Sequence, residues 1–191
     1  MWYLLYFEKK RVSITSQRLQ GLLAYIALHR TEPQTRQHIA FLIWPDSSES
    51  QAHTNLRTLL HRFQTTLPNI ALLLRIDTQT IAWQPNVEIG LDVIDFETSV
   101  SLAQKAVKSG DITASCNALE NAVTYYKGDL LSNCYDEWVL SERERLSQIL
   151  LDTLEKLVGL LEQSRNYTAA IAYTRRLVTL DPLNEAIYLR L

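Results

Sequence analysis

Apolar residues in the first third of the chain recur every three or four positions in two segments, which is the spacing of an amphipathic helix. The first helix is expected to begin after Ser16, a residue type suited to capping a helix. It should end near His29-Arg30, because Pro33 disfavours helix in the residue that precedes it. A second, shorter helix is expected over about 35–42, with Ile39 and Leu42 buried.

A third and longer helix is expected over about 49–67. Ser48 and Gln51 stand at the spacing of a capping box at its start, and Pro68 is expected to end it. Its apolar residues lie on one stripe, which we expect to face the core: Ala52, Leu56, Leu59, Leu60, Phe63 and Leu67.

Two segments that flank these helices show β patterns instead. Residues 2–14 contain aromatic and β-branched residues around a charged centre and predict a strand or a short hairpin. Leu72–Ile76 and Thr80–Trp83 are short β-like runs on either side of Asp77-Thr78-Gln79, which predicts a second hairpin. The first half of the chain is therefore expected to be a strand, three helices and a hairpin, the order of a winged helix-turn-helix.

Beyond residue 93 the pattern is helical almost throughout. The expected helices cover 96–108, 112–126, 136–162 and 167–180, with short polar turns between them. The run Tyr167-x-x-Ala170-Ile171-x-Tyr173, with Leu177, Leu180 and Asp181-Pro182 after it, matches the second half of a tetratricopeptide unit, and a looser copy follows Gly110. The fold class expected is mainly α with a small β component. A winged helix-turn-helix domain over 1–93 is followed by a tetratricopeptide-like domain over 94–191.

Composition and charge narrow the classes of function. Hydrophobic residues at 47% and charged residues at 21% are ordinary for a folded globular chain. Residues 1–93 hold nine Lys/Arg and seven Asp/Glu, whereas the remainder holds ten and fourteen, and all four histidines lie in the first part. This mild asymmetry predicts that any anion-binding face belongs to the N-terminal half.

The motifs of the common enzyme classes are missing from this sequence. Its five glycines are too scattered for a phosphate-binding loop or a dinucleotide fingerprint, and neither Cys116 nor Cys134 has a histidine near it in sequence. His53 and His61 share one side of the third helix but lack a third metal ligand at a suitable spacing. We therefore expect a protein that is not an enzyme and that uses no cofactor and no metal.

The outward face of the third helix is the strongest candidate for a functional site. With the apolar stripe turned inward, the helix presents His53, Thr54, Asn55, Arg57, Thr58, His61 and Arg62, and it carries no acid from Ser50 to Leu67. Arginine pairs with guanine and asparagine with adenine, and threonine or histidine reaches phosphates or base edges, so this set suits a DNA major groove. Arg36 and Arg75 are expected to add phosphate contacts. The alternative is an ordinary solvated polar face.

Several motifs, in order along the chain, resemble one family. Leu22 to His29, Ile43-Trp44-Pro45-Asp46 and Gln51-Ala52-x-x-Asn55-Leu56-Arg57 are similar to the output domains of bacterial SARP-type transcriptional activators. The later motifs resemble the bacterial transcriptional activation domain (BTAD) that follows in that family: Asp92-x-x-x-Phe96-Glu97, Tyr126-x-Gly128-Asp129-Leu130-Leu131, Trp138-x-x-x-Glu142-Arg143 and Asp181-Pro182-Leu183-Asn184-Glu185.

The resemblance implies an OmpR-like winged helix, fused to tetratricopeptide-like helices, that regulates transcription in the bacterial cytoplasm. Double-stranded DNA is then the expected partner of residues 1–93. A second protomer in a homodimer, RNA polymerase or further domains of the same protein are the expected partners of residues 94–191. Because neither half is strongly basic, we expect a single copy to bind weakly and paired half-sites to be needed.

A second hypothesis remains open, in which the chain is a protein-interaction or sensory module whose winged helix no longer binds DNA. Tyr125, Tyr126, Tyr173 and Tyr188 would then line a peptide-binding concavity, although packing between helices is the simpler expectation for them. No apolar run is long enough to span a membrane, and the order of charges at the start does not fit a signal peptide. The chain ends just after the start of a further helix, so we expect it to be part of a longer protein.

Overall fold

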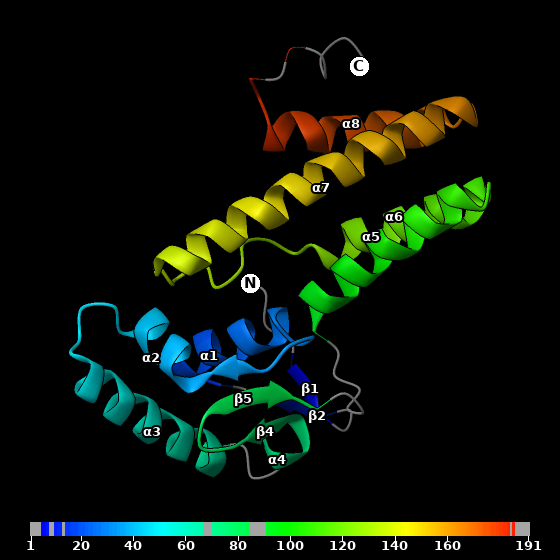
Figure 1. Ribbon diagram of the computed structural model, residues 1–191. Helices are drawn as coiled ribbons and strands as arrows, with labels where there is room; N and C mark the ends of the chain where they lie inside the picture. Colours follow the sequence, from blue (N-terminus) through cyan, green and yellow to red (C-terminus); the bar gives the residue numbers. More distant parts are fainter. Residues whose placement is uncertain are drawn as a thin grey trace. The chain divides into compact units, whose positions relative to one another are not determined.

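The computed structural model describes residues 14–66, 70–84, 91–183 and 185 in full, and the backbone of residues 5–7 and 10–12. The chain forms two compact units (Figure 1). One unit comprises Tyr3–Leu91 and Leu131–Val139, and the other comprises Asp92–Leu130 and Leu140–Leu191.

Three helices dominate the first unit: α1 (Gln17–Leu28), α2 (Arg36–Ile43) and α3 (Glu49–Thr66). Their order and extent confirm the predicted helices. Ser16 occupies the position before α1, but its side chain makes no capping hydrogen bond, so the expected cap is wrong in this respect. Helix α2, in contrast, is capped: the Thr35 hydroxyl accepts a hydrogen bond from the His38 N–H at 3.2 Å.

The buried residues of α2 differ slightly from the expected pair. Ile39 is buried as predicted, whereas Leu42 is only half-buried. Ala40 and Ile43 are buried instead: they lie about 100° and about 40° from Ile39 around the helix axis, whereas Leu42 lies about 60° from Ile39 in the other direction, toward solvent.

The strands form two small antiparallel sheets. β1 (Leu5–Phe7) pairs with β2 (Lys10–Val12) and confirms the N-terminal hairpin. β4 (Leu74–Ile76) and β5 (Thr80–Trp83) form the second hairpin, with Arg75 opposite Ala82. A two-residue strand, β3 (Gln34–Thr35), joins the other edge of β5 and gives the strand order β3-β5-β4. Sequence patterning did not predict β3.

The strand expected to begin at Leu72 starts two residues later, because a helical turn, α4 (Ile70–Leu73), precedes it. Ile70 and Leu73 are both buried. Residues three apart lie on the same side of a helix but on opposite faces of a strand, so a helical turn buries both side chains together.

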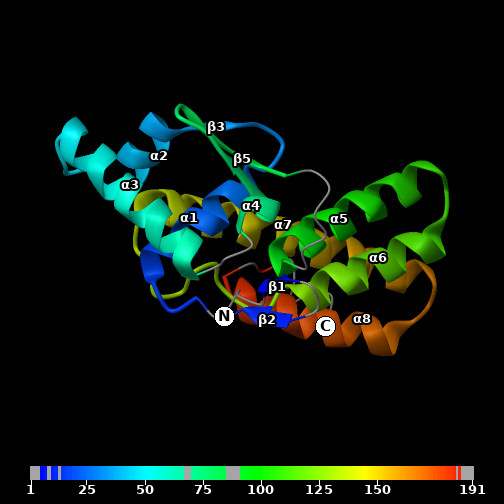
Figure 2. The same ribbon diagram turned by 90° about the horizontal axis from the view of Figure 1, so that it is seen from below.

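The core of this unit lies between α1, α2 and α3. Leu22, Ile39, Leu56 and Phe63 are completely or almost completely buried. Buried Tyr25 contributes its hydroxyl, which lies 2.8 Å from His38 Nε2 on α2. Helices α2 and α3 lie side by side in both views (Figures 1 and 2).

The segment 131–139 belongs to this unit although it is distant in sequence. Asp136 accepts a hydrogen bond from Arg18 at 3.0 Å, and the Trp138 ring meets the Tyr25 ring edge to face with 5.4 Å between centroids. Trp138 also packs beside Gly21, where an added Cβ would lie 3.7 Å from the indole ring. Helical periodicity does not predict these contacts, because it reports on one helix at a time.

The second unit consists of helices joined by short turns: α5 (Asp92–Lys108), α6 (Ile112–Tyr125), α7 (Glu137–Gln163) and α8 (Tyr167–Leu180). Helix α7 begins in the first unit and enters the second at Leu140. All four helices were predicted. Helix α5 starts at Asp92, earlier than the expected start at residue 96, and its first two residues, Asp92 and Val93, are buried. Helices α5 and α6 run side by side in both views (Figures 1 and 2).

The turns of the two helix pairs have the same construction. After α5, Gly110 adopts a positive φ of 77° and the Asp111 N–H donates to the Ala106 carbonyl; after α7, Arg165 adopts a φ of 60° and the Asn166 N–H donates to Leu161. Asp111 and Asn166 each then cap the next helix with a side-chain oxygen. This repetition confirms the tetratricopeptide-like reading of the helical half.

The tyrosines of this unit divide between packing and exposure. Tyr126 packs edge to face on Phe96 with 5.5 Å between ring centroids, and burial raises its pKa. Tyr173 is half-buried and Tyr125 is exposed, while Tyr188 lies outside the described residues. Arg145, on α7, forms ion pairs with Glu97 and Glu142, each at 2.8 Å. No helix in the described residues is long and apolar enough to cross a membrane.

Asp92 generates a prediction about pH. It is 7% exposed, and one carboxylate oxygen accepts from the Val93 N–H while the other has no hydrogen-bond partner among the described residues. Burial raises the pKa of Asp92 to about 6 from an ordinary value of 3.8. Because the folded state binds this proton more tightly, the contribution of Asp92 to stability is fully present below pH 3.8 and is lost as pH rises to about 6.

We therefore expect Asp92→Asn to raise the free energy of unfolding at pH 7 by about 1–3 kcal/mol, because the amide carries no charge into the core. Near pH 3.5 the two proteins should be equally stable. Urea denaturation at both pH values measures the difference. A difference that is the same at both pH values would contradict the assignment to Asp92 ionisation.

Candidate nucleic-acid interface

Helix α3 separates into an inner and an outer face. Ala52, Leu56, Leu59, Leu60 and Phe63 are all buried, as the apolar stripe predicts, and Leu67 lies outside the described residues. These residues span less than half of the helix circumference at 100° per residue. The opposite face is therefore free of packing within the described part of this unit.

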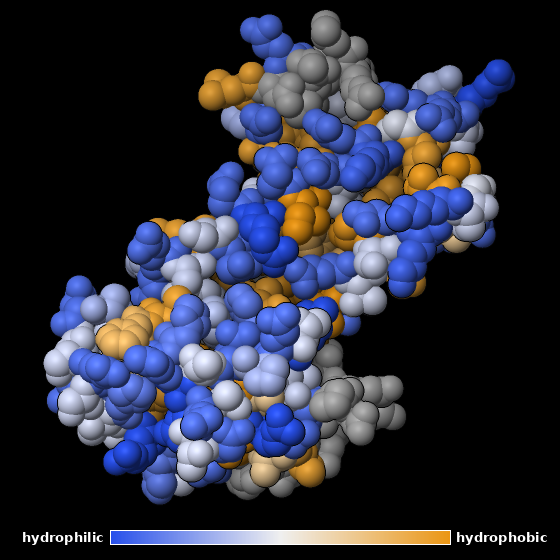
Figure 3. Space-filling view, in the orientation of Figure 1, coloured by the Kyte–Doolittle hydropathy of each residue, from blue (hydrophilic) through white to orange (hydrophobic). Residues whose placement is uncertain are grey.

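The predicted site residues on α3 fall into a central group and two flanks. Thr54, Arg57, Thr58, His61 and Arg62 are exposed and lie together on the outer face. His53 and Asn55 are half-buried, because they stand at the two borders between the outer face and the core stripe. The surface over α3, at the lower left of Figure 3, is accordingly hydrophilic.

The guanidinium groups of the two arginines on the outer face make no ion pair or hydrogen bond within the part of the chain that the structure describes. Arg57 and Arg62 are both exposed. Each guanidinium therefore keeps its full set of donors for an external anion, and no internal partner has to be displaced.

The threonine hydroxyls are already used within the helix. Thr54 Oγ1 donates to the Ser50 carbonyl at 2.9 Å, and Thr58 Oγ1 donates to the Thr54 carbonyl at 3.1 Å. Their hydroxyl protons are thereby committed, while their oxygen lone pairs and methyl groups remain on the exposed face. A threonine methyl suits contact with the methyl group of thymine.

The start of α3 carries a small polar network. The Gln51 N–H donates to Ser48 Oγ at 3.4 Å, which confirms the capping role of Ser48, whereas the Gln51 side chain donates to Asn55 Oδ1 at 2.8 Å. Glu49 Oε1 accepts from Gln37 at 3.2 Å and lies 3.9 Å from His53 Nε2. Glu49 is the one acid within α3, and it is the first residue of the helix.

Arg36 connects the hairpin to α2. Its backbone N–H donates to the Gln79 carbonyl at 2.8 Å, and its guanidinium donates to the Asp77 carbonyl at 3.2 Å. The expected phosphate ligand Arg36 is thus partly engaged in holding the β4–β5 turn beside the start of α2. Arg75, on β4, is exposed.

Asp77 organises the turn between β4 and β5. Its Oδ1 accepts from the Gln79 and Thr80 N–H groups at 2.9 and 2.6 Å, and its Oδ2 accepts from the Thr80 hydroxyl at 2.8 Å. The Thr80 backbone N–H, with further help from Gln79, lowers the pKa of the Asp77 carboxyl below its ordinary value. The Asp77 side chain therefore stays ionised, and accepts these hydrogen bonds, to a lower pH than an ordinary aspartate.

Sequence reasoning missed further exposed residues beside the predicted set, Gln51 and Thr65 among them. Gln51 and Thr65 are exposed, and each is three or four residues from another member of the central group or its flank. The same helical spacing would have included them. Among the described residues there is no cluster of three or more metal-binding side chains.

Comparison with known proteins places this architecture among SARP-type transcriptional regulators. Residues 91–191 match the family described as "Bacterial transcriptional activator domain". Regulatory protein AfsR of Streptomyces coelicolor is 23% identical over 172 residues, which are 90% of this chain and 17% of AfsR. A solved structure of Mycobacterium tuberculosis EmbR, in complex with a low-affinity phosphopeptide, has a TM-score of 0.79 at 15% identity and matches 96% of this chain and 49% of EmbR.

The chain belongs to the bacterial transcriptional activator domain family. The family is one of transcriptional regulators and is not a family of enzymes. The likeness to EmbR confirms the fold, a winged helix-turn-helix with tetratricopeptide-like helices. The chain spans about a sixth of AfsR and about half of EmbR.

The Asp77 turn yields a prediction about the hairpin. Asp77→Ala removes all three acceptor bonds, so the amides of Gln79 and Thr80 should lose protection from hydrogen exchange. Asp77→Asn is the matched control, because its Oδ1 can still accept both N–H bonds. Exchange followed residue by residue by NMR measures the effect. Unchanged protection in Asp77→Ala would mean that strand pairing alone holds the turn.

Proposed function

We propose that the chain is a DNA-binding transcriptional regulator that inserts α3 into the major groove of duplex DNA. One observation carries the proposal: the outer face of α3 has no acid from Ser50 to Thr66, and the Arg57 and Arg62 side chains have no partner among the described residues. A solvated helix face of no function usually mixes both signs of charge, whereas a face that meets phosphates and base edges excludes acids.

The residues of α3 are given distinct roles. Arg57 and Arg62 bind guanine edges or phosphates, and His61 lies beside them on the same face. Thr54 and Thr58 contribute oxygen lone pairs and methyl groups to the groove floor. Asn55 is assigned to adenine: its Oδ1 accepts from Gln51 with one lone pair and keeps the second for the base, and its amide group can donate. His53 stands at the border and is assigned a backbone contact.

Arg36 and Arg75 are assigned to the phosphate backbone. Arg75 is exposed on β4 and needs no rearrangement to reach a phosphate. Arg36 makes one side-chain hydrogen bond to the Asp77 carbonyl, so its guanidinium retains further donors for a phosphate while it holds the turn. Both contacts fix the position of the protein on DNA and carry no sequence information themselves.

In this proposal, residues 1–93 bind DNA and residues 94–191 bind protein partners. RNA polymerase, a second protomer or further domains of the same protein are the candidate partners of the helical part. Support comes from the tetratricopeptide-like construction, which in general serves protein contacts. Action in the cytoplasm follows from a role in bacterial transcription.

Selection of the 191-residue chain against a random duplex library tests the function. We expect enrichment of a short direct or inverted repeat, since two modest half-sites together supply the affinity that one lacks. Binding to the selected site should weaken steeply as salt rises. Absence of enrichment, for a chain shown to be folded by circular dichroism, would overturn DNA binding and favour a protein-interaction module.

The roles of Arg57 and Arg62 can be tested separately. Each single change to Ala should weaken binding to the selected site by about 1–3 kcal/mol and relax base preference at one position if that arginine reads a base. If it contacts a phosphate instead, affinity should fall for all sequences, and the slope of log K against log salt should decrease in size by about one.

Arg175→Ala is the matched control, because Arg175 is an exposed arginine on α8. It should leave both affinity and salt slope unchanged. Wild-type affinity in the double variant Arg57→Ala/Arg62→Ala, with an unchanged melting temperature, would exclude the outer face of α3 as the DNA contact.

A further inference from the structure

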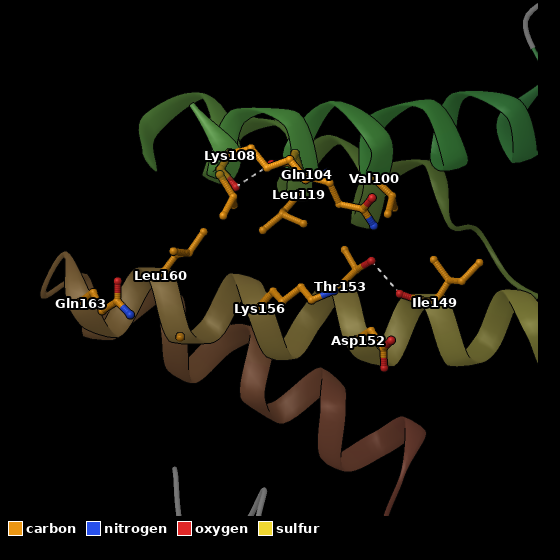
Figure 4. Close-up of a pocket in the computed structure, with 14 residues that line it drawn as sticks. Val100, Gln104, Lys108, Leu119, Ile149, Asp152, Thr153, Lys156, Leu160 and Gln163 are labelled. Atoms are coloured by element: carbon orange, nitrogen blue, oxygen red, sulfur yellow. Dashed lines mark hydrogen bonds between the residues drawn. The ribbon is translucent and has the colours of Figure 1, made fainter. Parts of the chain in front are cut away.

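A groove in the second unit lies between the α5–α6 pair and α7. Its volume is about 680 Å³, and its lining is mainly apolar. Val100, Gln104 and Leu119 extend from α5 and α6 toward Thr153, Lys156 and Leu160 on α7 (Figure 4). In Figure 3 the surface between these helices is correspondingly hydrophobic. Pockets of about 300–1,000 Å³ with few polar groups are typical of small-molecule sites.

The glycine on the wall of this groove has no packing role within the described residues. Gly159 lies inside helix α7, and a Cβ added to it would meet no atom within 4 Å. Glycine in a helix interior is destabilising relative to alanine, so its presence calls for a compensating use. Here it widens the groove at a point where alanine or a larger residue would enter it.

The polar groups of the groove favour an anion. The buried hydroxyls of Ser115 and Thr153 donate to the backbone carbonyls of Ala103 and Ile149, at 3.4 and 2.6 Å, and are satisfied. Lys108 and Lys156 also line the groove, and neither forms an ion pair within the described residues. The one lining acid, Asp152, accepts a hydrogen bond from Gln148 at 3.0 Å.

We propose that this groove binds a small amphipathic organic anion, with an apolar body against α5, α6 and Gly159 and an acidic group at Lys156. Three observations agree on this class of ligand: the volume of the groove, its apolar lining and its two lysines without acidic partners. A ligand site here is independent of the proposed DNA contact of α3, so either proposal can fail without the other.

Decanoate is a suitable probe, and decanol is its uncharged counterpart. Each is titrated below its micelle or solubility limit into the ¹⁵N-labelled 191-residue chain, and amide shifts are followed by NMR. We expect saturable shifts at residues 100–108, 115–119 and 149–163. Decanoate should bind about fivefold or more tightly than decanol, because the decanoate carboxylate can pair with a lysine.

Three variants separate the contributions of shape and charge. Gly159→Leu fills the groove and should weaken binding of both probes at least about tenfold, since buried apolar volume is lost to the ligand. Lys156→Met should weaken decanoate and leave decanol unchanged. Lys105→Met is the control, because Lys105 is an exposed lysine of α5 that does not line the groove, and neither affinity should change.

The proposal is overturned if decanoate and decanol bind equally in wild type, or if their shifts lie outside the groove. It is also overturned if Gly159→Leu keeps both affinities with an unchanged melting temperature. Should Gly159→Leu fail to fold, Lys156→Met with the two probes still decides the matter. Sedimentation that shows wild-type self-association, abolished by Gly159→Leu with no effect on decanoate, would assign the groove to a second copy instead.

Discussion

The burial of one face of α3 is the constraint on which the proposed interface depends. Leu56 and Phe63 are completely buried and lie two turns apart, so they fix the rotation of the helix about its axis. Once that rotation is fixed, Arg57 and Arg62 can only point outward. Hydrophobic packing inside the unit therefore sets which polar side chains meet a partner, without any direct bond to those side chains.

The hairpin combines burial of Leu74 and Ile81 with hydrogen bonds at its turn. Its turn is closed by one carboxylate, Asp77, and is joined to the start of α2 through the backbone and guanidinium of Arg36. Strand β3 adds a short edge to the same sheet. Hydrogen bonds thus hold the hairpin to the helix-turn-helix, and Arg36 has a structural contact in addition to its proposed role at phosphates.

The helical unit uses one design twice, with different results. Gly110 and Arg165 occupy equivalent left-handed positions in the two turns, but only glycine adopts that conformation without strain. The α5–α6 pair and helix α7 do not pack closely along their whole length, since Gly159 leaves open space between them. The two turns therefore match, but a groove stays open beside Gly159, and the proposed ligand site lies in that groove.

The sequence by itself determined the β4–β5 hairpin, the buried face of α3 and every described helix except the turn α4, because periodicity and local turn chemistry act within a few residues. Tertiary structure decided the features that join distant residues. The pairing of β3 with β5, the helical turn at Ile70–Leu73 and the contact of Trp138 with Tyr25 all depend on partners far along the chain. The hydrogen bond of Arg36 to the Asp77 carbonyl and the groove beside Gly159 were likewise decided by the tertiary structure, since no local pattern specifies which surfaces meet.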